Sequence, residues 1–141
     1  MALRTFLATL LCASALAACS ATQAADQLGA TCDQLSAAHS IQQSTSVAAG
    51  ADVQVVLCSN PTTGFSWEDP QIADASVARL ISATYQAPAT ASLPIIGAAG
   101  GEIVTIHALA AGTTTLSMRY SQPWAGGTKG AWTYTLAITV E

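Results

Sequence analysis

The sequence predicts an all-β fold, namely an immunoglobulin-like antiparallel β-sandwich of about seven strands. Two features of the sequence support this fold class. Short segments rich in Val, Ile, Thr and aromatic residues succeed one another, with Gly, Pro and Asn turn signals between them. No segment after residue 38 has the apolar spacing of an amphipathic helix, so the two layers of the domain are expected to be sheets.

The alternation of apolar and polar residues places the individual strands. The last segment alternates most clearly, because every second residue from Trp132 to Val140 is large and apolar and the residues between are Thr or Ala. Asp74-Ala75-Ser76 can form one helical turn, and little other helix is expected. The strands are expected at residues 39–47, 52–59, 65–69, 77–86, 102–110, 113–121 and 132–140.

Three connections between these strands are expected at the same end of the sandwich. Successive connections in an antiparallel sandwich alternate between its two ends. Residues 60–65, the Gly-rich residues 97–101 and residues 121–127 all lie in alternate connections. The connection at residues 87–101 is also long for a compact domain. Loops held on a rigid scaffold commonly carry function, so this edge is the candidate binding surface.

The N-terminal residues are expected to direct export of the protein. Residues 1–18 contain Arg4 and an apolar run too short to span a membrane, as in a signal peptide. Leu-Ala-Ala-Cys at residues 16–19 matches the bacterial lipoprotein processing box and predicts lipidation of Cys19. An ordinary secretory signal whose cleavage removes Cys19 is the alternative. Ser20 resembles the outer-membrane sorting pattern of Gram-negative bacteria, so the expected location is the cell envelope, as an outer-membrane lipoprotein facing the periplasm or the cell surface.

After the signal, one domain is expected. Residues 19–38 are rich in Ala, Ser, Thr and Gln and are predicted to be a tether, and residues 39–141 suffice for one domain with one core. Without residues 1–18 the chain has three basic and eight acidic residues, a formal net charge of −5 with neutral histidines. An acidic surface argues against nucleic acid as a partner.

Two cysteines remain in the expected domain and tether, Cys32 and Cys58. Because an exported protein meets an oxidising environment, a disulfide between them is favoured over two free thiols. His39 and His107 have no metal-ligand spacing with either cysteine, so no metal site is expected.

The three candidate loops contain recognisable residue patterns. Residues 60–65 are Asn-Pro-Thr-Thr-Gly-Phe, residues 97–102 are Gly-Ala-Ala-Gly-Gly-Glu, and residues 122–124 are Gln-Pro-Trp. Their order and spacing resemble the signature loops of the chagasin family of cysteine peptidase inhibitors, and the likeness spans residues 39–141. The first loop has the complete Asn-Pro-Thr-Thr-Gly motif and the Gly-rich loop is a looser match. The third departs from the family, which usually has Arg where this chain has Gln122.

The resemblance implies a monomeric domain that inhibits papain-like (clan CA) cysteine proteases reversibly and competitively, by a wedge of three loops. Thr62 and Thr63 would lie nearest the catalytic cysteine and histidine of the protease. The Gly-rich loop would line the non-primed subsites, and Trp124 would stack on the primed side. The implied protease-binding residues are Asn60, Pro61, Thr62, Thr63, Gly64, Phe65, Gly97, Gly100, Gly101, Gln122, Pro123 and Trp124.

An enzymatic function is not expected, and neither is a cofactor. The chain has two histidines and lacks a Ser nucleophile elbow, a paired-His metal motif and a phosphate loop. The alternative function is an immunoglobulin-like envelope lipoprotein that acts as an adhesion or assembly module. That function would explain the sandwich and the tether but not three matched loops at one end. Adding the purified domain to papain and measuring substrate turnover discriminates between them.

Overall fold

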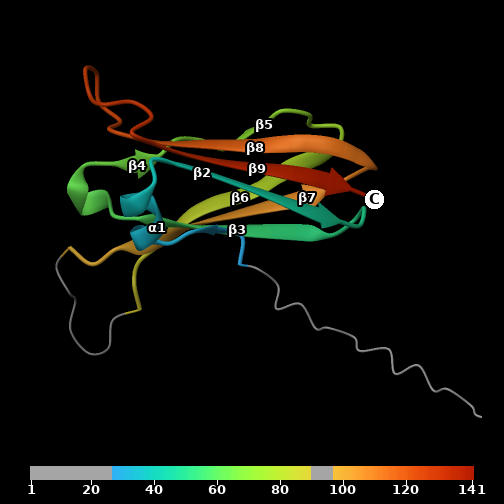
Figure 1. The fold of residues 1–141 in the computed structure, drawn as a ribbon, viewed down its shortest axis with the longest axis horizontal. Coiled ribbons are helices and arrows are strands. Elements are labelled where there is room, and N and C mark those ends of the chain that lie inside the picture. Colours follow the sequence, from blue (N-terminus) through green and yellow to red (C-terminus); the bar gives the residue numbers. More distant parts are fainter. Residues whose placement is uncertain (1–26, 90–96) are drawn as a thin grey trace, which may run out of the picture.

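The chain forms two β-sheets that pack face to face in the computed structural model, which describes residues 27–89 and 97–141 (Figure 1). Helix α1 spans Cys32–Ala37, and a 3-10 helix spans Pro61–Thr63. The strands are β1 (Gly29–Ala30), β2 (Ser40–Val47), β3 (Asp52–Ser59), β4 (Ser66–Trp67), β5 (Gln71–Ile72), β6 (Ala78–Gln86), β7 (Gly100–Ala108), β8 (Gly112–Ser121) and β9 (Trp132–Val140). One sheet has the order β1-β3-β7-β6, and the other has the order β2-β9-β8-β4 with β5 also paired to β8.

The predicted β-sandwich is confirmed, and the core lies between the two sheets. Each expected strand has an observed counterpart, and the two strands begin within two residues of each other and end within two residues of each other. Alternate residues of β3, β7, β8 and β9 point inward, as the period-two pattern predicts. Burying a large apolar side chain contributes about 1.5–3 kcal/mol. The fully buried ones include Val55, Leu57, Val104, Ile106, Leu116, Tyr134, Leu136 and Ile138.

The sheets are mixed, whereas purely antiparallel sheets were expected. Strand β2 pairs with β9 in parallel, in register from Ser40 opposite Thr133 to Val47 opposite Val140. Strand β1 also pairs in parallel, with β3. The N-terminal segment therefore adds a strand to one sheet, crosses through α1 and adds an edge strand to the other. Alternation along the sequence identifies a strand but not its neighbour, so this crossing was not predicted.

Part of the expected tether is folded. Thr31 caps α1 with a capping box, in which its side chain accepts from the N–H of Gln34 and its own N–H donates to the side chain of Gln34. Leu35 is only 7% exposed and belongs to the core. At the edge of the sandwich, Oε1 of Gln43 accepts from the N–H of Gly29 and from the hydroxyl of Tyr134. Residues 27–38 are thus part of the domain.

The remaining helix expectations differ from the structure in smaller ways. Asp74-Ala75-Ser76 forms a turn and not a helix, because the Asp74 carboxylate accepts from both the N–H and the hydroxyl of Ser76. Within the described residues, no helix is long and apolar enough to span a membrane. The predicted signal peptide, the predicted lipidation site Cys19 and the start of the predicted tether lie outside the described residues.

Candidate functional site

The three predicted loops, residues 60–65, 97–101 and 121–127, meet at one end of the sandwich. We call these loops, together with residues 128–130 that complete the third, the loop end. Figure 1 shows this end opposite the C-terminus, with α1 beside it. The side-chain amide of Asn60 donates to the carbonyl of Gly97 at 2.9 Å, which joins the first loop to the second. Trp124 lies against Gly64, since a Cβ there would be 2.9 Å from Cη2 of the indole. Residues 90–96, which precede the second loop in the same connection, lie outside the described residues.

The first loop is a short 3-10 turn organised by Asn60. Its Oδ1 accepts from the N–H of Thr62 at 3.3 Å and from the Thr62 hydroxyl at 2.6 Å. The Thr63 hydroxyl donates to the carbonyl of Asn60 at 2.7 Å. Pro61 occupies the first turn, and Gly64 ends the turn in the left-handed conformation at φ +81°. Both threonines are exposed, but their hydroxyl protons are engaged within the loop, so the loop has one defined shape.

An aromatic cluster supports this loop from below. The Phe65 ring lies 5.7 Å from the Tyr120 ring and 5.4 Å from the Trp132 ring, measured between centroids. The N–H of Asn60 donates to the Tyr120 hydroxyl at 2.8 Å. The indole N–H of Trp67 donates to the carbonyl of Cys58 at 3.0 Å. Phe65, which the resemblance placed among the protease-binding residues, packs in the structure as part of the scaffold under the loop.

The second loop has glycines of two kinds. Gly97 has a φ of +83° and accepts the hydrogen bond from Asn60. Gly100 lies in β7, where a Cβ would be 2.2 Å from the carbonyl oxygen of Gln86 and within 3 Å of the Tyr85 ring. At Gly101, a Cβ would meet the Val56 side chain at 3.3 Å. Gly100 and Gly101 therefore allow the strands and side chains around β7 to pack closely.

An acidic side chain follows these glycines on the inward-facing side of β7. Glu102 is in register with Leu57 of β3 and Tyr85 of β6. It alternates with the buried Val104, so it points toward the space between the sheets at the loop end. Burial raises the pKa of the Glu102 carboxyl above its ordinary value.

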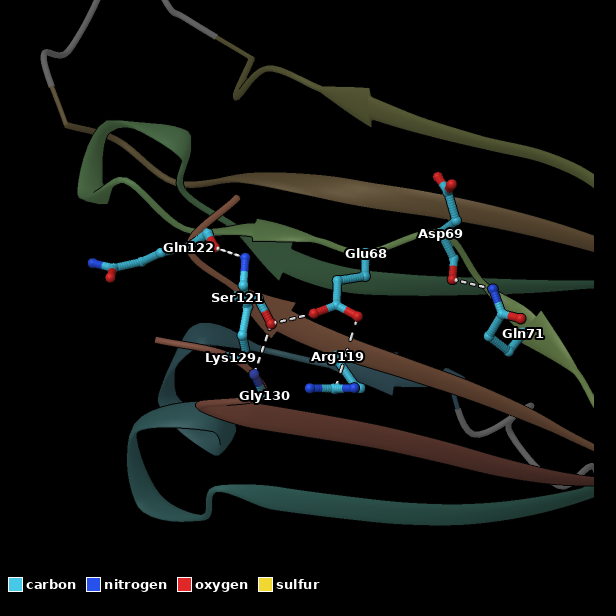
Figure 2. Close-up of polar contacts among 8 residues, drawn as sticks. All are labelled: Glu68, Asp69, Gln71, Arg119, Ser121, Gln122, Lys129 and Gly130. Carbon is cyan, nitrogen blue, oxygen red and sulfur yellow. Dashed lines mark hydrogen bonds and ion pairs between the residues drawn. The ribbon is translucent and has the colours of Figure 1, made fainter. Parts of the chain in front are cut away.

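The third loop is held by polar contacts at its base (Figure 2). Gln122 pairs with Thr128 twice, through the backbone at 2.8 Å and through its own Oε1, which accepts from the Thr128 N–H at 2.9 Å. The Lys129 ammonium donates to the carbonyls of Gln122 and Trp124. Pro123 and Trp124 are exposed beyond these contacts, and Trp124 is 50% exposed. The side chain of Gln122 thus helps to shape the loop, and Arg could not replace its bond to Thr128 because the Arg side chain has no acceptor.

A second group of contacts ties Glu68, which directly follows β4, to the same loop. Figure 2 shows the Ser121 hydroxyl between Glu68 and Gly130. The hydroxyl donates to Oε1 of Glu68 at 2.5 Å and accepts from the N–H of Gly130 at 2.7 Å. Arg119 lies 3.8 Å from the other carboxylate oxygen, an exposed pair that contributes little stability. Sequence reasoning did not find these residues, because nothing in their spacing marks them as neighbours.

Helix α1 adds a fourth element to the loop end. Cys32 at its start is joined by a disulfide to Cys58, two residues before Asn60. The indole N–H of Trp132 donates to the carbonyl of Leu35 at 2.9 Å. Among the residues of 27–89 and 97–141, no group of three or more His, Cys, Asp or Glu side chains could hold a metal ion.

The proteins that this chain resembles in sequence and in structure are peptidase inhibitors. The family model described as "Chagasin family peptidase inhibitor I42" matches residues 46–138. Chagasin of Trypanosoma cruzi is 34% identical over 87 residues, which cover 57% of this chain and 73% of chagasin. The crystal structure of the cysteine protease inhibitor EhICP2 from Entamoeba histolytica superposes with a TM-score of 0.59 at 21% identity, covering 73% of this chain and 95% of EhICP2. The structural likeness supports the fold, and the family match begins after β1 and α1.

Proposed function

Because the chain belongs to the chagasin family of peptidase inhibitors, we propose that it is a reversible, competitive inhibitor of papain-like (clan CA) cysteine proteases. The loop end enters the active-site cleft and blocks substrate. The observation that carries this proposal is the rigid turn at residues 60–64, which contacts both neighbouring loops. The 34% identical relative is named chagasin, and the family description is that of a peptidase inhibitor.

The first loop can occupy a protease cleft without being cut. A protease cleaves an extended backbone whose carbonyl lies at attack distance from the nucleophile. Residues 61–63 instead form a 3-10 turn, and their ends are fixed by Asn60 and by the left-handed Gly64. The turn is also formed before binding, which lowers the entropy cost of association. The protein acts by shape and needs no chemical step of its own.

Each loop has a distinct role in this proposal. Thr62 and Thr63 present their exposed methyl groups and hydroxyl oxygens to the catalytic cysteine and histidine of the protease. The loop at Gly97 lines the non-primed side of the cleft, and Trp124 stacks on the primed side. The other motif residues hold these groups in place, as Asn60 does through its amide.

Steady-state inhibition of papain and several related proteases tests the function. The wild-type domain is expected to raise KM for a peptide substrate without changing kcat, with no covalent adduct by mass spectrometry. Replacing Thr62 and Thr63 together by Ala is expected to weaken inhibition. Replacing both by Ser is the matched control, because Ser keeps the hydroxyls that bond to Asn60.

A folded wild-type domain that leaves all these proteases uninhibited at micromolar concentration would contradict the proposal. The envelope adhesion or assembly module would then be the better interpretation. Circular dichroism of each variant establishes that the fold is intact. Under the inhibitor function, the domain is a monomer, which sedimentation analysis checks.

We propose in addition that Cys19 is lipidated and anchors the protein in the bacterial envelope, facing the periplasm or the cell surface. The support is the Leu-Ala-Ala-Cys tetrapeptide directly after an apolar run. A fatty-acid probe is expected to label the wild-type protein but not Cys19→Ala. Equal labelling of both proteins would show that Cys19 is not the acceptor.

A further inference from the structure

An apolar hollow of about 280 Å³ lies at the loop end between α1 and the β3–β4 loop. The side chains of Leu35, Phe65, Tyr120 and Trp132 line it, together with the disulfide of Cys32. Among the residues that the structure describes, no charged side chain contributes to its lining. A closed apolar cavity of about 150 Å³ accommodates benzene, so this hollow has room for one branched or aromatic side chain.

The hollow is a built feature, because α1 is fastened on several sides. The disulfide joins its first residue, Cys32, to β3. Trp132 donates its indole N–H to the carbonyl of Leu35, and Leu35 is packed into the core. The capping box at Thr31 satisfies the first turn of the helix. A six-residue helix would not be stable alone, so these contacts keep α1 in place.

The rim of the hollow belongs to the loops that face the protease. Asn60 and Thr63 come from the first loop, and Ala99 comes from the second. A protein that covers these loops must also reach the mouth of the hollow. The opposite wall is α1, which lies before the region that matches the family model. The hollow therefore extends the three-loop surface with an element outside the family match.

We propose that this hollow receives an apolar side chain from the wall of the protease cleft, so that α1 is a fourth contact element that helps to select the target. The inference rests on the proposed inhibitor function. An uncharged lining of rings and aliphatic groups favours an apolar side chain over a charged one, because a charge would lose its hydration without gaining a partner. Proteases with a charged residue at this place are inhibited less well.

The experiment fills the hollow and measures inhibition. Ser36 lines the hollow from α1, and Ser36→Phe places a ring in it; Ala37→Phe adds the same ring at an exposed helix position outside the lining. The new ring occupies the hollow, so the apolar side chain of the protease can no longer be buried there. Losing the burial of one apolar side chain is expected to raise the inhibition constant of Ser36→Phe for papain by about tenfold or more. Ala37→Phe is expected to change it less than about twofold. Reductant used to activate the protease is removed before mixing, so that the disulfide stays intact.

A second variant and a second readout make the outcome decisive. Ser36→Leu fills the hollow with a smaller apolar side chain from the same helix position, and is expected to act in the same direction as Ser36→Phe. The indole N–H resonance of Trp132 is expected to shift when labelled wild-type protein binds papain, because this ring lines the hollow.

Wild-type inhibition that both filling variants retain in full would overturn the inference while leaving the inhibitor function intact. Failure of the wild type to inhibit would overturn the inhibitor function itself. A dimer of the free protein that Ser36→Phe abolishes would assign the hollow to a second copy and also overturn the inference. If Ser36→Phe does not fold, Ser36→Leu decides the result.

Discussion

Replacing Trp124 by Ala is expected to weaken protease inhibition strongly while leaving the domain folded. The indole lies across Gly64 at the tip of the loop end and is 50% exposed before any partner binds. Aromatic side chains of this kind are frequent anchors at interfaces. The exposed half of the ring is the part that a partner can cover.

The size of the effect follows from that exposed area. Trp can bury about 250 Å², so half exposure leaves about 125 Å² for the complex, and about 25 cal/mol per Å² gives about 3 kcal/mol as an upper value. Imperfect coverage lowers it to between about 2 and 3 kcal/mol, or about 30-fold to 150-fold in the inhibition constant. The free domain is expected to lose less than about 1 kcal/mol, because Trp124 lies outside the core.

Inhibition constants for papain, measured with thermal unfolding of each variant, test this reasoning. Trp124→Phe is the matched control and is expected to fall between wild type and Trp124→Ala. Gly64→Ala is expected to disturb the same contact, because its Cβ would approach Cη2 of the indole and its φ is positive. The two substitutions should therefore be non-additive in a double-mutant cycle. Equal inhibition by Trp124→Ala and wild type would show that the third loop does not contact the protease.

Four further outcomes are expected. Replacing Cys32 and Cys58 by Ser opens a loop with a sequence separation of 26 residues and is expected to cost about 3.5 kcal/mol in urea denaturation; an unchanged midpoint would contradict this. Asn60→Ala removes both the side-chain acceptor for Thr62 and the donor to Gly97, whereas Asn60→Asp keeps the acceptor. Asn60→Ala is therefore expected to raise the inhibition constant more than Asn60→Asp does. Because burial raises the folded-state pKa of Glu102, ionisation of this carboxyl destabilises the folded state as pH rises. The melting temperature of Glu102→Gln should therefore exceed that of the wild type at pH 7, and the difference should vanish below about pH 4, where the wild-type carboxyl is protonated in both states. Gln122→Arg removes the acceptor for Thr128 and is expected not to tighten inhibition; a tighter inhibition constant would refute the shaping role.

The strands were predictable because their two faces meet different environments. In β9 the large residues are buried and the residues between them are more exposed, so the sequence pattern reports burial directly. The placement of the three loops at one end was predictable because they lie in alternate connections, which fall at the same end of a sandwich. The parallel pairing of β2 with β9 was not predictable in this way. Successive residues of β2 alternate between exposed and half-buried, and an antiparallel edge strand would show the same alternation.

Helix α1 was missed because its stability comes from residues far away in the sequence. It has six residues and buries only Leu35, too few for a helical period to be visible. The Thr31 and Gln34 capping box was present in the sequence but is a short pattern in an Ala-rich and Ser-rich segment. What holds the helix is the disulfide to β3 and the indole of Trp132, 97 residues from Leu35.

The structure also explains why the first loop matches its family so completely while the third does not. In the first loop, Asn60 bonds to Thr62, Thr63 and Gly97, so most motif residues are needed for the shape of the turn whatever they contact. In the third loop, the backbone bond between residues 122 and 128 and the two Lys129 contacts do not involve the side chain at position 122, so this side chain can differ while part of the loop shape is kept. A motif of this kind encodes a rigid turn first and a contact second. A substitution in such a motif is therefore expected to weaken inhibition more when the replaced residue makes more of the contacts that hold the loop in its shape.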